Sequence, residues 1–186
     1  MSNSSSTKFN YQDLINIFEK TFLINFNTQL VCGDDEPIYL PADNENPHHR
    51  IIFAHGFYAS ALHETAHWLV AGEKRRLLED YGYWYEPDGR NAAQQAEFEK
   101  VEVVPQAIEW AIAMSCGFTF DVSADNLSGI EIDRLAFKHK VHQQVLTYLE
   151  NGFSVRTSQL INACCEFYKT PLLTKDMFNY KGMISF

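Results

Sequence analysis

Two histidines separated by three residues constrain this chain more than any other feature. His63 and His67 belong to the segment H-E-T-A-H, in which Glu64 follows the first histidine. Residues i and i+4 share one face of an α-helix, so both imidazoles can bind one metal ion only if the segment is helical. Apolar residues at positions 62, 66, 69 and 70 give such a helix a side to bury. A random chain of this composition would contain the pattern about 0.02 times, and we therefore predict a metal-binding helix.

A third ligand is expected, because two imidazoles alone make a weak site. Glu102 lies 35 positions after His67, in a second long helical segment that is able to bring a carboxylate to the first helix. Glu99, one turn earlier, lies on nearly the same face and is the rival candidate. We favour Glu102, because the valines around it indicate burial, where an unpaired carboxylate is costly.

The ligand set leaves two kinds of metal site open. With zinc, the motif is typical of hydrolases in which a metal-bound water attacks the substrate and Glu64 acts as a general base. With Fe(II), a set of two histidines and one carboxylate is typical of oxygenases that keep positions open for O₂. Spacing does not distinguish the two. A carboxylate-bridged di-iron site is disfavoured, because the other E-x-x-H match, at residues 45–48, contains a proline in a polar segment.

Hydrophobic periodicity and turn residues predict an α+β fold, a helix-rich single domain with a small mixed sheet. The metal site is expected between the H-E-x-x-H helix and the long helix that follows it, an arrangement like that of zincins. Ser60 is expected to cap the first of these helices, and Pro105 to kink the second near Val101 or to start a new segment. Residues 1–8 are expected to be a flexible tail before a catalytic domain at residues 9–186. The predicted helices are 9–22, 60–71, 91–116, 133–150 and 157–168, and the predicted strands are 29–32, 38–40 and 50–54.

The composition excludes several classes of protein. The chain has 186 residues, with 15 Lys+Arg and 24 Asp+Glu, and a formal net charge of −9. Such an acidic chain repels phosphate backbones, so we expect no nucleic-acid partner. No stretch approaches the roughly 20 apolar residues that span a membrane, and we recognise no signal peptide at the N-terminus. The four cysteines form no C-x-x-C pair, so reduced and mostly buried thiols in a cytoplasmic protein are expected.

Several longer stretches of sequence are far more specific than the metal motif alone. They are D-D-E-P-I-Y-L-P-A-D at 34–43, R-I-I-F-A-H-G-F-Y-A-S at 50–60, H-E-x-x-H-W at 63–68, G-Y-W-Y at 82–85 followed by P-D-G-R at 87–90, and F-E-x-V-E-V at 98–103. Together and in this order, they resemble the elongation factor P hydroxylase family. The resemblance extends from about Tyr11 to Tyr168 and carries little after Thr170.

The resemblance implies a bacterial enzyme that hydroxylates the modified lysine of elongation factor P after β-lysine has been attached to it. It also implies a non-haem Fe(II) centre with O₂ as co-substrate and, carried over residue by residue, the ligands His63, His67 and Glu102. In this role Glu64 is expected to orient a ligand or to move protons. A zinc-dependent peptidase or nuclease is the alternative. The sequence does not identify the reductant.

Two groups of residues beside the motif are predicted to serve the same site. His55, in a glycine-flanked turn just before the metal helix, is expected to act near the metal or on the substrate, or else to hydrogen-bond the backbone. Asp34 and Asp35 precede Glu36 in an acidic cluster. Because the family's substrate carries ammonium groups, these carboxylates are predicted to hold its β-lysyl end, with simple solvation as the other interpretation.

Aromatic residues supply a third group of candidates. Tyr58 and Trp84 are predicted to form a pocket for an aliphatic cation by cation–π contact, or else to pack in the core. Asp88 and Arg90 follow Trp84 in a turn and are expected to contact substrate or to fix their loop.

Overall fold

Three short strands form a mixed sheet in the first third of the chain. β1 (Thr28–Gly33) pairs in parallel with β3 (His49–Ala54), and β2 (Ile38–Leu40) pairs antiparallel with the other side of β3. The register places Leu30 opposite Ile51. Residues directly opposite each other on paired strands face the same side of the sheet, and both of these side chains are buried. The predicted strands are confirmed to within one residue at each end.

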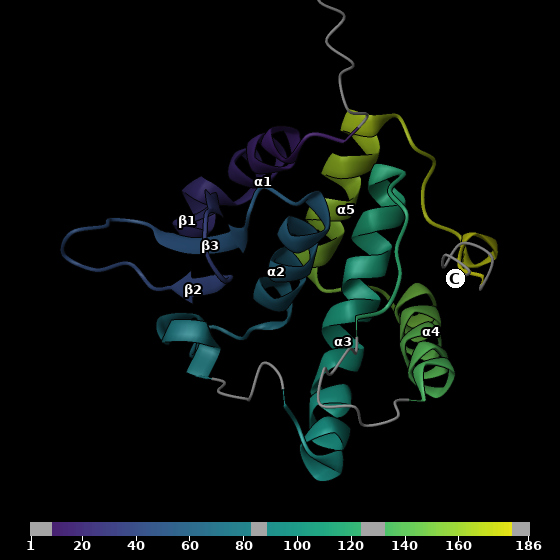
Figure 1. Ribbon diagram of the computed structural model, residues 1–186. Helices are drawn as coiled ribbons and strands as arrows, with labels where there is room; N and C mark the ends of the chain where they lie inside the picture. The colour runs from purple at the N-terminus through teal and green to yellow at the C-terminus, as the bar shows by residue number, and fades with distance from the viewer. Residues whose placement is uncertain (1–8, 83–88, 124–132, 180–186) are drawn as a thin grey trace, which may run out of the picture.

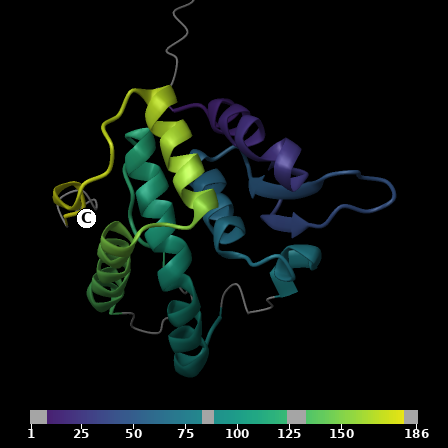
Figure 2. The ribbon, with the colours of Figure 1, turned by 180° about the vertical axis from the view of Figure 1, so that it is seen from behind.

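The computed structural model describes residues 9–82, 89–123 and 133–179. Figures 1 and 2 show α2 between the sheet on one side and α3, α4 and α5 on the other. α3 packs against α2, α4 and α5, while α1 covers β1. None of the described helices combines the length and the apolar character needed to cross a membrane. The helices are α1 (Tyr11–Phe26), α2 (Tyr58–Val70), α3 (Ala92–Cys116), α4 (Arg134–Asn151) and α5 (Val155–Tyr168), with short 3₁₀ turns η1 (Arg75–Leu77), η2 (Glu79–Gly82) and η3 (Lys175–Met177).

The start of α2 differs from the prediction. Ser60 does not cap the helix: the N-cap is Phe57, and the hydroxyl of Ser60 instead accepts from the backbone N–H of Ala54 at 3.0 Å. The chain enters the helix early because His55 and Gly56 form a left-handed turn, with φ of 51° and 69°. Glycine adopts positive φ without strain, and histidine does so more readily than most residues. The turn and the Ser60 bond together fix α2 to the end of β3.

The long helix α3 runs unbroken through Pro105, so of the two predicted outcomes the start of a new segment is wrong, and a kink near Val101 stays a prediction. A capping box begins the helix, in which Asn91 and Gln94 each accept from the other's backbone N–H. Gly117, in the left-handed conformation, ends it. The proline removes only the one hydrogen bond that its missing N–H would donate to the carbonyl of Val101. Burial of the second half of the helix outweighs that loss, since nearly every residue there lies in the core.

The C-terminal end of α2 is held by a distant arginine. Arg156 on α5 donates to the carbonyl oxygens of Trp68, Leu69 and Ala71, at 3.1, 3.1 and 2.7 Å. The last carbonyls of a helix have no partners within it, so these bonds satisfy groups that would otherwise be costly to bury. The guanidinium also lies 4.6 Å from the ring centroid of Trp68, whose indole is fully buried. α2 is therefore tied to β3 at one end and to α5 at the other.

All four cysteines are free, as predicted. Cys116, Cys164 and Cys165 are buried between α3 and α5, and Cys32 is exposed on β1.

Candidate metal centre

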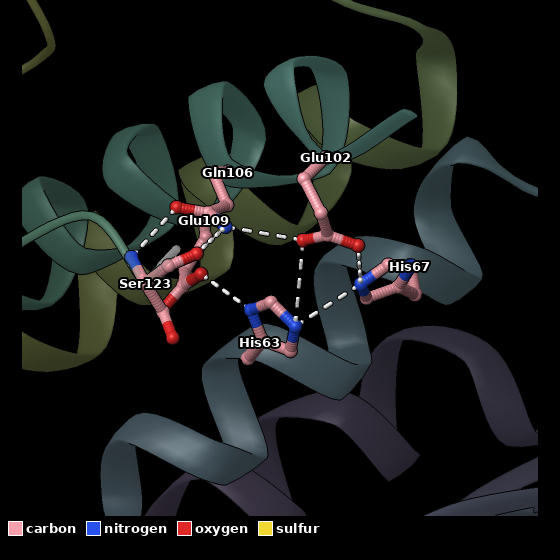
Figure 3. Close-up of polar contacts among 6 residues, drawn as sticks. All are labelled: His63, His67, Glu102, Gln106, Glu109 and Ser123. Carbon is pink, nitrogen blue, oxygen red and sulfur yellow. Dashed lines mark hydrogen bonds and ion pairs between the residues drawn. The ribbon is translucent and has the colours of Figure 1, made fainter. Parts of the chain in front are cut away.

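α2 and α3 bring the three predicted ligands together (Figure 3). The Nε2 atoms of His63 and His67 lie 3.1 Å apart. Glu102 Oε1 lies 3.3 Å from His67 Nε2, and Glu102 Oε2 lies 3.8 Å from His63 Nε2. One ligand atom from each of the three residues falls within 4.8 Å of the other two. Glu102 is 1% exposed, so it presents its carboxylate from the interior toward the half-buried imidazoles.

These separations fit a shared metal ion. Ligand atoms about 2.1 Å from one ion lie about 3.0 Å apart at a right angle and about 3.4 Å apart at a tetrahedral angle. The distances of 3.1 and 3.3 Å fall within this range, and the distance of 3.8 Å slightly exceeds it. Glu102 Oε1 is also buried without a hydrogen-bond partner, which is costly for a carboxylate oxygen. A bound cation would satisfy this oxygen and both Nε2 lone pairs.

The rival carboxylate, Glu99, lies elsewhere. Its Oε2 is 3.7 Å from Lys140 Nζ on α4, and its Oε1 accepts from Gln95 at 3.4 Å. The prediction that the valines around Glu102 indicate burial is only partly correct, because Val101 is 44% exposed whereas Glu102 beside it is buried. The structure thus places Glu102, and not Glu99, beside the histidines.

Two further polar residues of α3, which the sequence did not single out, surround the ligands. Glu109 Oε2 lies 2.8 Å from Nδ1 of His63. Gln106 donates through its amide to Glu102 Oε2 at 3.1 Å and to the carbonyl of Ser123 at 2.6 Å, and it accepts from the N–H of Ser123 at 3.0 Å. Their spacing was the available signal, because positions 102, 106 and 109 lie on one face of a helix.

The electrostatics of the centre favour a cation. Burial alone would lower the pKa of His63, but the carboxylates around it, chiefly Glu109, raise that pKa to about 10. Burial alone would raise the pKa of Glu102, but His67, His63 and Gln106 lower it to about 2. Burial raises the pKa of Glu64 above its usual value, against the opposing effect of the two histidines. Carboxylates therefore dominate the potential at this point, which favours a proton or another cation there.

A cavity of about 1090 Å³ adjoins the centre, with Glu64, His67 and Glu102 on its wall. Its volume suits a small ligand or an extended side chain. The described residues that line it include five carboxylates and two basic side chains, so the cavity is acidic. Besides the two glutamates already named, the charged residues of the wall are Glu36, Glu73, Lys74, Arg75 and Asp80.

One part of the cavity wall is fixed to the edge of the sheet. Asp80 accepts from the backbone N–H of Tyr39 on β2 at 2.8 Å, and Tyr81 stacks on Tyr39 with 4.4 Å between ring centroids. Arg75 donates to the carbonyl of Tyr81 at 2.8 Å. Asp80 and Tyr81 adopt positive φ, of 44° and 59°, an uncommon conformation that persists only where the surroundings impose it.

Three of the other predicted residues lie at the surface. His55 is exposed in the left-handed turn before α2, and Asp34 and Asp35 are exposed between β1 and β2. Neither His55 nor the aspartates line the cavity, although the neighbouring Glu36 does. Their proposed roles stay predictions.

The structure describes only two of the four residues predicted in the aromatic group and the turn after it, Tyr58 and Arg90. Tyr58 is buried, its hydroxyl hydrogen-bonds that of Tyr168 at 2.9 Å, and burial raises its pKa. Arg90 is 2% exposed, donates to Gln95 at 2.9 Å and lies 3.9 Å from the ring centroid of Phe98. Both are packed in the interior. The predictions for Trp84 and Asp88 concern positions outside the described residues.

Comparison with known proteins agrees with the resemblance. The sequence profile of the elongation factor P hydroxylase family matches residues 17–178. A protein of Haemophilus influenzae named elongation factor P lysine hydroxylase is 55% identical over 159 residues, which cover 86% of this chain and 89% of that protein. The match includes α2 and α3 and therefore the whole candidate centre. The chain belongs to the elongation factor P hydroxylase family.

Proposed function

We propose that this protein hydroxylates the β-lysyl-modified lysine of elongation factor P at a non-haem iron centre held by His63, His67 and Glu102. The observation that carries the proposal is the convergence of these three side chains beside a large cavity. Family membership supports the reaction and the substrate, since the relative from Haemophilus influenzae is named for lysine hydroxylation of this factor. A translation factor as substrate would place the enzyme in the cytoplasm, and the acidic charge supports a mechanism without nucleic acid.

Iron accounts for the chemistry better than zinc does. Bound Fe(II), with O₂ as co-substrate and a reductant, would supply the oxidising power that an unactivated C–H bond requires. The chain's own residues would bind the metal ion and orient it toward the substrate. His63, His67 and Glu102 would hold the ion, and two of them, His67 and Glu102, face the cavity in which the substrate would lie. Glu64, with its raised pKa, would hold or move a proton at its carboxylate on the same wall.

The acidic cavity matches the proposed substrate. A lysine that carries an attached β-lysine has a long aliphatic chain and ammonium groups. Glu36, Glu73 and Asp80 line the cavity beside Val70 and Val101, so its wall offers both carboxylates and apolar surface. We propose that the carboxylates pair with the ammonium groups while the apolar residues contact the aliphatic chain.

Mass spectrometry of elongation factor P tests the proposal. Enzyme purified without oxygen and loaded with Fe(II) should add the mass of one oxygen atom to the β-lysylated factor when O₂ and a chemical reductant are supplied. His63→Ala and Glu102→Ala should abolish this gain. His139→Ala is the matched control, because His139 is exposed on α4. An iron-loaded wild-type enzyme that leaves the mass of the factor unchanged would contradict the proposal.

The zinc-dependent hydrolase remains the second candidate, because Glu64 lies on the cavity wall beside His67, where a general base of a zincin-like site would be needed. Elemental analysis separates the two. About one iron per chain, lost in Glu102→Ala, supports the hydroxylase. About one zinc per chain, with no hydroxylation restored by Fe(II) and with hydrolysis lost in Glu64→Gln, supports the hydrolase.

A further inference from the structure

The imidazole of His63 is held on its far side by a carboxylate of the neighbouring helix. Glu109 Oε2 lies 2.8 Å from His63 Nδ1, and Glu109 is 9% exposed. Figure 3 shows that Glu109 meets the ring nitrogen that points away from His67. An ionised carboxylate can only accept a hydrogen bond, so Nδ1 carries the proton and donates it.

This hydrogen bond determines which nitrogen is free to bind a metal. A neutral imidazole protonated at Nδ1 has its lone pair on Nε2. In His63 this is the atom that lies 3.1 Å from His67 Nε2 and 3.8 Å from Glu102 Oε2. The opposite tautomer would place a proton between the three ligand atoms. Building on the proposed function, we propose that Glu109 is a positioning residue that fixes the tautomer and orientation of His63 so that Nε2 binds the metal.

The surroundings of Glu109 support this role. It lies in an apolar stretch of α3, where the adjacent Ile108 and Trp110 are buried. A carboxylate in such a place is costly unless a specific partner compensates for it, and His63 is that partner. Glu109 is not placed as a fourth ligand, because it contacts the nitrogen remote from Glu102 and His67. One face of α3 thus supplies a ligand, Glu102, and the support for another ligand.

Metal affinity provides a test that does not depend on turnover. Zinc is the probe, because it is diamagnetic and suits the same donor atoms. Competition with a chromophoric chelator would give the zinc affinity of the full-length wild type, Glu109→Leu, Glu109→Gln and the control Glu97→Leu, in which an exposed glutamate of the same helix is replaced. We expect Glu109→Leu to bind about tenfold to a hundredfold more weakly. Glu109→Gln, whose amide oxygen still accepts, should lose only about threefold, and Glu97→Leu should match the wild type.

Nitrogen-15 NMR of the zinc-loaded proteins gives the second readout. The wild type should show His63 bound through Nε2, with a protected Nδ1–H proton that disappears in Glu109→Leu and shifts in Glu109→Gln. A role in packing alone would not produce this signal or its partial rescue by glutamine. Equal zinc affinity of wild type and Glu109→Leu, or binding of zinc through Nδ1, would overturn the proposal.

Failure of a variant to fold and failure of the proposed function can each be told apart from failure of the role proposed for Glu109. If Glu109→Leu does not fold, Glu109→Gln decides: reduced affinity with a shifted Nδ1–H signal supports the proposal, and an unchanged affinity and signal overturn it. A wild type that fails to hydroxylate elongation factor P, yet binds zinc less tightly after Glu109→Leu, would contradict the proposed function and support the role of Glu109.

Discussion

The guanidinium of Arg156 on α5 donates to the carbonyl oxygen of Ala71, 2.7 Å away, at the end of the helix that carries both candidate histidine ligands. The two residues are 85 positions apart in the sequence. Together with the bonds to Trp68 and Leu69, this contact makes the position of α2 depend on a helix that contributes no ligand of its own.

Replacing Arg156 should therefore weaken the fold. Arg156→Met keeps an unbranched stem against Trp68 but leaves the carbonyls of Trp68 and Leu69 without their side-chain donor, while the carbonyl of Ala71 keeps its bond from Arg76. We expect the free energy of unfolding to fall by about 2–4 kcal/mol, which lowers the melting temperature by about 5–10 °C in a domain of this size. Thermal unfolding followed by circular dichroism measures the change. Gln159→Met, at an exposed position of the same helix, should melt like the wild type, and equal melting of Arg156→Met would show that the three bonds contribute little.

Removal of the metal from the candidate centre should lower the stability of the fold. Fe(II) or Zn²⁺ at about a hundred times its dissociation constant stabilises the folded state by about 2.7 kcal/mol, which raises the melting temperature by about 5–10 °C. Glu102→Gln should abolish this increase, because it removes the anionic ligand with little change of shape. Glu99→Gln should retain it, since Glu99 pairs with Lys140. The reverse result would assign the ligand role to Glu99.

The metal-free protein should become less stable as the pH rises. The pKa of His63 is raised from 6.5 to about 10 in the folded state, where the carboxylates outweigh the effect of burial. A group whose folded pKa is raised contributes stability that is fully present below about pH 6.5 and is lost as the pH approaches 10. Urea unfolding of chelator-treated protein at pH 6, 8 and 10 tests this. Subtracting the same series for His63→Gln isolates the contribution of His63, and identical slopes for the two proteins would contradict the prediction.

Gln106 should affect stability and metal binding together. Gln106→Met removes the donor to Glu102 and leaves both backbone groups of Ser123 without their side-chain partner. We expect a loss of about 2–3 kcal/mol in the free energy of unfolding and weaker zinc binding, both measured on the metal-free protein by denaturation and titration. Gln143→Met, at an exposed position on α4, is the matched control. A variant with wild-type stability would show that other groups replace these bonds.

Charges on the cavity wall should affect substrate binding more than catalysis. Glu36→Gln and Glu73→Gln should each raise KM for β-lysylated elongation factor P by about twofold to fivefold, with kcat and metal affinity unchanged. Asp34→Asn provides the comparison, because Asp34 is exposed and does not line the cavity. A larger effect of Asp34→Asn than of Glu36→Gln would favour the prediction made from the acidic cluster over the one made from the cavity.

Local patterns account for the features that the sequence predicted well. The strands and helices follow the spacing of apolar residues, and the i, i+4 spacing of His63 and His67 determines that their imidazoles share a face of α2. Spacing alone narrowed the carboxylate ligand to two residues one turn apart, Glu99 and Glu102, and the argument from burial favoured Glu102. Tertiary contacts separate them: Lys140 on α4 pairs with Glu99, while the histidines face Glu102.

The features that were missed depend on partners that no local pattern contains. Ser60 is a residue type that often caps helices, but a left-handed turn before it makes the helix start earlier. Its hydroxyl instead accepts a hydrogen bond from the backbone N–H of Ala54. Glu109 resembles an ordinary helix glutamate until α2 is packed against α3. Glu73 and Asp80 are brought to the cavity by turns whose path depends on the sheet edge at Tyr39.

Pro105 has a consequence for the interpretation of mutational scans. Because proline has no N–H, the main-chain carbonyl of Val101 has no donor four residues later in α3, and both residues line the cavity next to Glu102. This oxygen is an uncharged acceptor that does not titrate, and it belongs to the backbone. A scan that replaces side chains one at a time would leave it in place at every position except 105, where any other residue would restore the donor and remove the acceptor.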